Sequence, residues 1–92
     1  MLYHILCKDK PGQLQTRLDN REAHLAFVNA LGDRLFAAGP LLDDKDDMVG
    51  SVLIIDFNSD EAAADFCASD PYALAGLFED VSIKRWRKTL PN

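Results

Sequence analysis

The segment that most limits how this chain can fold is the run GSVLIIDFN, residues 50–58. Its side chains are mostly aliphatic and β-branched, which is typical of a strand. Alternate side chains of a strand point to opposite faces of the sheet, so Val52 and Ile54 face one side. Leu53 and Ile55 face the other side. A sheet with one face in water carries polar residues at every second position, so both faces of this sheet are expected to be covered.

Apolar runs and turn residues predict four strands and two helices. The strands are expected at residues 2–7, 39–44, 50–58 and 77–88, and the helices at residues 19–38 and 59–70. The order β-α-β-β-α-β is typical of a ferredoxin-like α+β fold. In that fold a four-stranded antiparallel sheet carries both helices on one face.

The first predicted helix contains the stripe of residues on which the functional hypothesis depends. Asp19 or Asn20 is suited to cap its start, and Gly39 followed by Pro40 is suited to end it near residue 38. Helical spacing then places these side chains on one buried face: His24, Phe27, Val28, Leu31 and Leu35. In the second helix, Ser59 is the expected N-cap.

Two helices cover only one face of the sheet, so the second apolar face needs a partner. The chain of 92 residues suits one domain, residues 1–92, and a domain of this size buries a modest fraction of its surface. We therefore expect a homodimer in which the sheets of two copies pack together.

The charge balance argues against nucleic acids and membranes as partners. Ten basic and fifteen acidic residues give a net charge of −5, whereas nucleic-acid binding needs a basic surface. The basic run at residues 84–88 would alternate between the faces of a strand. The acidic run at residues 43–47 lacks the ligand spacing of an EF-hand and is expected to be a solvated loop. No metal site and no membrane span are predicted.

The two cysteines, Cys7 and Cys67, form neither a metal-binding nor a redox spacing. One is expected in a strand and the other in a helix. Reduced thiols in the cytoplasm are therefore favoured over a disulfide, and the start of the chain does not resemble a signal peptide.

Polar side chains in unexpected places point to acid–base chemistry. His24 lies on the apolar stripe of the first helix, with Arg21 and Arg17 one and two turns before it. A histidine exchanges protons near neutral pH, and a carboxylate such as Asp70 can orient its ring. An arginine can hold an anionic oxygen. Such a set suits proton abstraction, addition–elimination or isomerisation of a small anionic substrate.

Structural interpretations of the same residues remain open. His24 can be a hydrogen-bonded group of the core, and Asp70 before Pro71 can form a turn. Tyr72 can be a packing residue with a solvated hydroxyl, and Ser51 a small residue near a strand end. Arg17 can lie in the loop before the helix and face water.

Several short motifs occur in an order that resembles the YCII-related (YciI-like) family. They are Arg-x-x-His at residues 21–24, GPL at 39–41, GS at 50–51, DPY at 70–72, AG at 75–76 and the late Trp86. The resemblance implies a dimeric α+β barrel, similar to muconolactone isomerase, with an active site around His24 and Asp70. One branch of the family resembles dehydrochlorinases that act on chlorinated hydroxyquinones, but nothing in this sequence points to that substrate.

The residues and the resemblance together predict a cofactor-independent lyase or isomerase. In this hypothesis His24 is the general acid or base and Asp70 orients it. Arg17 or Arg21 steers an anionic substrate, and a second set of side chains lines the pocket: Ser51 and Tyr72. The alternative is a non-catalytic domain that binds a small ligand or serves as an accessory interaction module.

Overall fold

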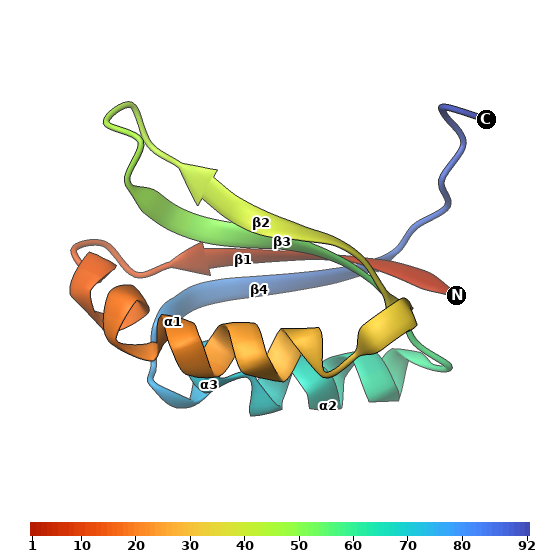
Figure 1. Cartoon of the computed structure of the whole chain (residues 1–92), viewed down its shortest axis with the longest axis horizontal. Coiled ribbons are helices and arrows are strands. Elements are labelled where there is room, and N and C mark those ends of the chain that lie inside the picture. Colours follow the sequence, from red (N-terminus) through yellow and green to blue (C-terminus); the bar gives the residue numbers. More distant parts are fainter.

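The computed structural model describes all 92 residues and contains one four-stranded antiparallel sheet. The strands lie in the order β2-β3-β1-β4 (Figure 1). Their bounds are β1 (Leu2–Asp9), β2 (Leu35–Leu42), β3 (Met48–Asp56) and β4 (Phe78–Arg85). The predicted ferredoxin-like α+β fold is confirmed, because each neighbouring pair is antiparallel and the two central strands are first and third in the chain.

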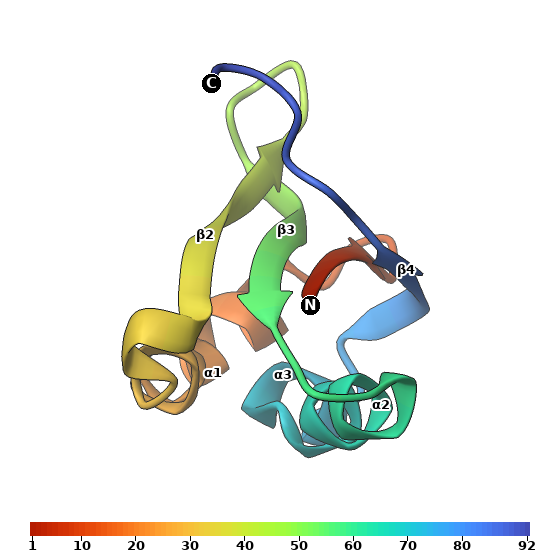
Figure 2. The same ribbon diagram turned by 90° about the vertical axis from the view of Figure 1, so that its right-hand side faces the viewer.

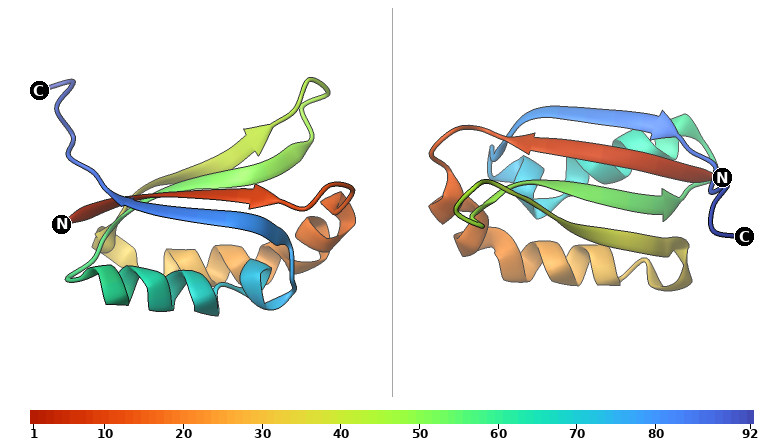
Figure 3. Two further views of the ribbon diagram at one scale, coloured as in Figure 1. Left: turned by 180° about the vertical axis from the view of Figure 1, so that it is seen from behind. Right: turned by 90° about the horizontal axis from the view of Figure 1, so that it is seen from above.

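All helices lie on the same face of the sheet. They are α1 (Leu14–Asn29), α2 (Asp60–Ser69), the short α3 (Pro71–Leu74) and a 3-10 turn at Gly32–Arg34. The end-on view shows them below the sheet, and the view from above shows the strands uncovered on the opposite side (Figures 2 and 3). None of these helices is both long and apolar enough to cross a bilayer.

The start of the first helix differs from the prediction. α1 begins at Leu14, so the predicted cap at Asp19 or Asn20 is wrong. The N-cap position belongs to Gln13, whose side chain makes no capping hydrogen bond. The preceding turn contains Gly12 with a φ of 72°, a left-handed conformation that glycine adopts without strain. The chain therefore reverses before residue 13, and the helix starts almost two turns earlier than its polar residues suggest.

The end of the first helix is also earlier than predicted. α1 ends at Asn29 and not near residue 38, and Gly32 then adopts a φ of 60°. Gly39 does not end a helix, because it lies within β2 and pairs with Val52. Pairing along the sheet edge satisfies the same backbone groups that a longer helix would satisfy, and here it overrides the helical spacing.

The predicted stripe is consequently shared between two elements. His24 and Val28 are buried on α1, and Phe27 and Leu31 are half-buried beside them. Leu35 belongs to β2 instead. The stripe still faces the core, but its last member reaches the core from the sheet.

The other predicted elements differ only at their ends. The second strand begins at Leu35, before the predicted residue 39, and the last strand ends at Arg85, before the predicted residue 88. Ser59 is the N-cap of α2 as predicted, since its hydroxyl accepts a hydrogen bond from the backbone N–H of Ala62 at 3.0 Å.

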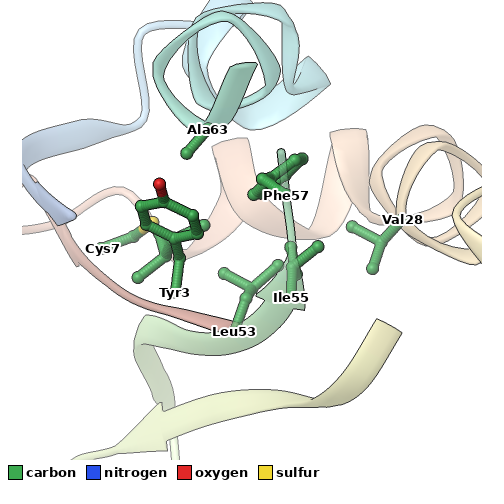
Figure 4. Close-up of a cluster of buried hydrophobic side chains, with 8 residues drawn as sticks. Tyr3, Cys7, Val28, Leu53, Ile55, Phe57 and Ala63 are labelled. Atoms are coloured by element: carbon green, nitrogen blue, oxygen red, sulfur yellow. The ribbon is translucent and has the colours of Figure 1, made fainter. Parts of the chain in front are cut away.

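The hydrophobic core fills the space between the sheet and the helices (Figure 4). Its buried members are Tyr3, Ile5, Cys7, Val28, Leu53, Ile55, Phe57 and Ala63. Both cysteines are unpaired, as predicted. Burial raises the pKa of the Cys7 thiol to about 12, so this side chain behaves as a small apolar residue at neutral pH.

The opposite face of the sheet carries no helix, and apolar side chains lie among polar ones on it. Leu6 pairs with Val52, and His4 pairs with Ile54, so these four side chains share that face. Leu6 keeps 38% of its surface exposed. The two-sided apolar pattern of the central strand is therefore confirmed, and the helices bury only one side of it.

Gly50 is the point of closest approach between β3 and β1. A Cβ atom at this position would lie 2.5 Å from the backbone oxygen of Cys7. We expect Gly50→Ala to lower the free energy of unfolding by about 1–3 kcal/mol, because two paired strands must separate. Urea denaturation measures the change. Gly39→Ala is the matched control, since nothing lies within 4 Å of its Cβ position and its φ is not left-handed. Equal stability of both variants would contradict the prediction.

Candidate active site

The first predicted pair of site residues is in direct contact. The Nδ1 atom of His24 lies 2.9 Å from one carboxylate oxygen of Asp70 and 3.1 Å from the other. Both side chains are buried, with 7% and 3% of their surface exposed. They are 46 positions apart in the chain, so the packing of α1 against the α2–α3 junction brings them together.

Asp70 occupies the junction between α2 and α3. It is the last residue before α3, and its carboxylate accepts a hydrogen bond from the backbone N–H of Tyr72 at 2.9 Å. Pro71 at the first helical position needs no such partner, because it has no N–H. Asp70 is therefore both a helix cap and the partner of His24. Asp70 thus forms the turn before Pro71 and also contacts the His24 ring, so the two interpretations do not exclude each other.

The contact with Asp70 determines which nitrogen of the His24 imidazole carries the proton. A carboxylate only accepts hydrogen bonds, so Nδ1 carries a proton in this contact. In the neutral ring the free electron pair is then on Nε2. No buried polar side-chain atom lacks a hydrogen bond, and Nε2 makes none within the chain, so Nε2 is accessible to solvent. His24 also lines a cavity.

Tyr72 holds the His24 ring from one side. The two rings stack with centroids 3.9 Å apart and planes inclined by 12°. Burial raises the pKa of Tyr72, although attraction to Arg17 and Arg21 opposes part of the rise. The hydroxyl is therefore protonated at neutral pH and is able to donate a hydrogen bond. Only 1% of the residue is exposed, so the interpretation of Tyr72 as a packing residue holds for its ring.

Arg17 is buried on α1, so its placement in a water-facing loop is wrong. Its Nε and Nη2 atoms donate to the two carboxylate oxygens of Asp9 at 2.7 and 2.8 Å. Nη2 also donates to the hydroxyl of Ser51 at 3.0 Å. Burial opposes the charge, but hydrogen bonding and attraction to Asp9 outweigh it and raise the pKa of Arg17. The guanidinium also lies over the Tyr72 ring, 4.6 Å from its centroid.

Asp9 is the site residue that the sequence analysis missed. It lies outside the strand predicted at residues 2–7, but it is the last residue of β1 and is 8% exposed. A signal was present, because inward-facing positions of this strand alternate through Tyr3, Ile5 and Cys7. Continuing that alternation places Asp9 inside, where a charge requires a partner.

A cavity of about 240 Å³ lies between α1 and the strands β2 and β3. Five of the six predicted site residues line it: Arg17, Arg21, His24, Ser51 and Tyr72. The sixth, Asp70, lies behind His24. Both arginines therefore reach the cavity, but they differ in availability. Arg17 is neutralised by Asp9, whereas Arg21 is exposed and makes no ion pair. Leu25, Val28 and Leu35 supply part of the apolar wall.

The structure contains no cluster of three or more side chains suited to hold a metal ion. His4 lies on the uncovered face of the sheet, opposite His24, so the two histidines do not share a site. The polar side chains at the cavity are His24, which contacts Asp70, the ion-paired Arg17, the unpaired Arg21, Asn29, Ser51 and Tyr72.

Comparison with known proteins finds a matching family model and relatives of similar sequence. The model of the YCII-related domain matches residues 1–87. The chain is 43% identical to Protein YciI of Escherichia coli over 96 aligned positions, which cover 96% of this chain and 98% of the relative. It is 40% identical to an uncharacterised protein of Haemophilus influenzae over the same coverage.

Two solved structures show the fold and its variation. The 5-chloro-2-hydroxyhydroquinone dehydrochlorinase of Burkholderia phenoliruptrix, in complex with 2,5-dihydroxybenzoquinone, is 39% identical with a TM-score of 0.90. That similarity covers 97% of this chain and 96% of the dehydrochlorinase. A cofactor-independent oxygenase of Streptomyces nogalater covers 99% of this chain and 97% of its own, with a TM-score of 0.62. At 18% identity it shares the fold alone.

Removal of the Asp9 carboxylate tests the buried ion pair. In Asp9→Asn the Arg17 charge stays buried without its counter-ion, so we expect the free energy of unfolding to fall by about 3–5 kcal/mol. Urea denaturation at neutral pH measures it. The control is Glu79→Gln, which breaks the exposed 3.9 Å pair with Lys8 and should change stability by no more than about 0.5 kcal/mol. A small effect of Asp9→Asn would show that groups other than Asp9 compensate the buried charge of Arg17.

Proposed function

The chain belongs to the YCII-related family, and from that premise we propose that it is a cofactor-independent lyase or isomerase acting on a small anionic molecule. The observation that carries the proposal is the orientation of His24. Its Nδ1 is held by Asp70 at 2.9 Å, and its Nε2 is accessible beside a cavity of about 240 Å³. A positioned histidine of this kind transfers protons efficiently at neutral pH.

Each residue of the site has a distinct role in this proposal. His24 accepts a proton from the substrate at Nε2 and returns one in a later step. Asp70 stabilises the imidazolium that forms in between. Tyr72 restricts rotation of the ring and offers its hydroxyl to a developing negative charge. Arg17, whose fork is occupied by Asp9, holds Ser51 and the Tyr72 ring in position.

Arg21 is the group that selects an anion. It lines the cavity and has no carboxylate partner, so its guanidinium is free to bind a phenolate, enolate or carboxylate oxygen. The apolar wall of the cavity suits a ring or a short carbon chain. An oxygen-rich six-membered ring offers an anionic oxygen for Arg21 and a flat carbon ring for the apolar wall. The 39% identical dehydrochlorinase is in complex with 2,5-dihydroxybenzoquinone. We therefore propose hydroxylated quinones and hydroquinones as the substrate class.

Elimination of hydrogen chloride from such a ring balances without a cofactor. His24 first moves a proton from one ring hydroxyl to the carbon that bears chlorine, so that this hydroxyl becomes a carbonyl and the carbon becomes tetrahedral. A second hydroxyl then gives its proton to His24, its O–H electrons form the second carbonyl, the ring double bond shifts to the former C–Cl carbon, and chloride leaves with the electron pair of the C–Cl bond. No oxidant or reductant is needed, because only hydrogen chloride is lost. Isomerisation of a hydroxyquinone uses the same two proton transfers and no leaving group.

A non-catalytic ligand-binding domain is the second candidate function. The free charge of Arg21 supports it, because a cation beside an apolar cavity binds an anion whether or not a proton moves. Measurements on one ligand separate the two functions, since only the enzyme forms a product.

The proposal extends to assembly and location. The uncovered face of the sheet exposes Leu6 and shares Val52 and Ile54, so we propose that two copies pack through this face as a homodimer. The unpaired thiols of Cys7 and Cys67 fit a reducing compartment, which supports the cytoplasm.

Substitution of His24 tests the catalytic role. With 5-chloro-2-hydroxyhydroquinone as the first probe, we expect the wild type to release chloride above the uncatalysed rate. His24→Gln should lower kcat/KM by about 100-fold or more, and Asp70→Asn by about tenfold or more. Chloride release and absorbance of the quinone measure both. His4→Gln is the matched control, because the only other histidine lies on the opposite face of the sheet.

Calorimetry with 2,5-dihydroxybenzoquinone supplies the second readout. Binding that is lost in Arg21→Gln, together with no chloride release by the wild type, supports the ligand-binding function in place of catalysis. Full activity of His24→Gln would contradict the acid–base mechanism.

Disruption of the uncovered face tests the homodimer. We expect the wild type to sediment as a dimer at micromolar concentration. Leu6→Lys places a charge at the centre of the interface and should produce monomers. Leu74→Lys, on α3 at 75% exposure, introduces the same charge on the helical side and should leave the dimer intact. A monomeric wild type would contradict the proposed assembly.

A further inference from the structure

Two oppositely charged segments have no role in the acid–base site. The acidic hairpin, residues 43–47 between β2 and β3, contains four aspartates and one lysine. The C-terminal segment, residues 86–92 after β4, contains Arg87 and Lys88 and no acidic residue. Neither segment forms an ion pair within the chain, since the four ion pairs of the structure all involve other residues.

The two segments lie at opposite ends of the molecule. In Figure 1 the acidic hairpin is at one end of the sheet and the C-terminal segment rises at the other. Both extend on the side away from the helices, as the end-on view also shows (Figure 2). The C-terminal segment spans about 25 Å when fully extended, which is less than the 36 Å long axis of the chain. Its charges are therefore better placed to meet a second copy than to meet their own hairpin.

A groove of about 610 Å³ runs between the acidic hairpin and the turn after β1. Leu6, Leu41 and Val49 line it, each with 38–41% of its surface exposed. Asp43 and Asp47 of the hairpin stand along it. Lys8 and Lys10 line the groove as well, and Lys8 already has a carboxylate, Glu79, at 3.9 Å. Asp43 accepts backbone hydrogen bonds from Lys45 and Asp47, but neither aspartate forms an ion pair. Apolar side chains flanked by carboxylates without a cation suit a segment that is itself apolar and basic.

We propose that this groove binds the C-terminal segment of a second copy of the chain. This inference rests on the homodimer proposed above and specifies its orientation. Arg87 and Lys88 of one copy lie against the acidic hairpin of the other, and Leu90, which is 77% exposed in the single chain, covers the apolar side chains. A two-fold axis that packs the two uncovered faces together, with the hairpin of each copy beside the C-terminal segment of the other, makes both contacts at once.

The docked segment borders the catalytic cavity. Met48 lines both the groove and the cavity that contains His24. A segment seated in the groove therefore packs beside the shared wall, so the second copy restricts the open side of the site. Assembly and access to His24 are coupled through this one side chain.

Charge reversal in two complementary variants tests the contact. The hairpin-reversed variant carries Asp44→Lys and Asp47→Lys, and the tail-reversed variant carries Arg87→Glu and Lys88→Glu. In a dimer formed by either variant alone, like charges meet at both contacts between hairpin and C-terminal segment. We therefore expect the dimer Kd to rise by about tenfold or more. Mixed together, they form heterodimers in which both contacts are attractive, and the Kd should return to within about threefold of the wild type. Sedimentation equilibrium measures the dimer Kd of each variant and of their mixture.

The control reverses two exposed acids on the helical side, Glu22→Lys and Asp65→Lys, and should leave the dimer Kd unchanged. Wild-type Kd values for both reversed variants would overturn the docking. So would weakened dimers that do not recover on mixing, because a segment bound to its own hairpin gains nothing from a partner. An equal loss in the helical control would assign the effect to net charge alone. The chloride-release comparison of the wild type with His24→Gln does not use the dimer Kd, so failure of the docking and failure of the proposed enzyme are distinguishable.

Discussion

The buried ion pair between Arg17 and Asp9 determines where α1 lies on the sheet, and the site depends on that placement. Asp9 ends β1, and Arg17 also reaches Ser51 on β3, so one guanidinium ties the helix to two strands. The same guanidinium lies over Tyr72, whose ring stacks on His24. The geometry of His24 thus follows from a buried charge whose loss of hydration is offset by three hydrogen bonds.

The two faces of the sheet carry different tasks. The covered face packs against α1 and α2 and holds the cavity at the edge of the core. The other face carries no helix in a single chain, and it includes the apolar side chains of Leu6, Val52 and Ile54. A chain of 92 residues has too few helices to bury both faces, which is why we propose that a second copy covers the other one.

Much of the fold and of the site was predictable, and the errors have a common origin. Alternation along the central strand predicted two apolar faces, and the order of strands and helices predicted the ferredoxin-like arrangement. The end of α1 was wrong because residues 35–38 have helical spacing but gain more by pairing with β3. Asp9 was missed because the predicted first strand stopped at residue 7, two positions short of this inward-facing end of β1. Pairing between distant residues leaves no period in the sequence.

The sequence by itself determined the order of the elements, the need for a second layer on the sheet and the side chains able to move a proton. These depend on periodicity and on side-chain chemistry, which are local properties. The tertiary structure decided which groups meet. It joined His24 to Asp70 across 46 positions, neutralised Arg17 and left Arg21 free at the cavity. Charges are paired or left free by burial and proximity in space, and only the packed chain sets both.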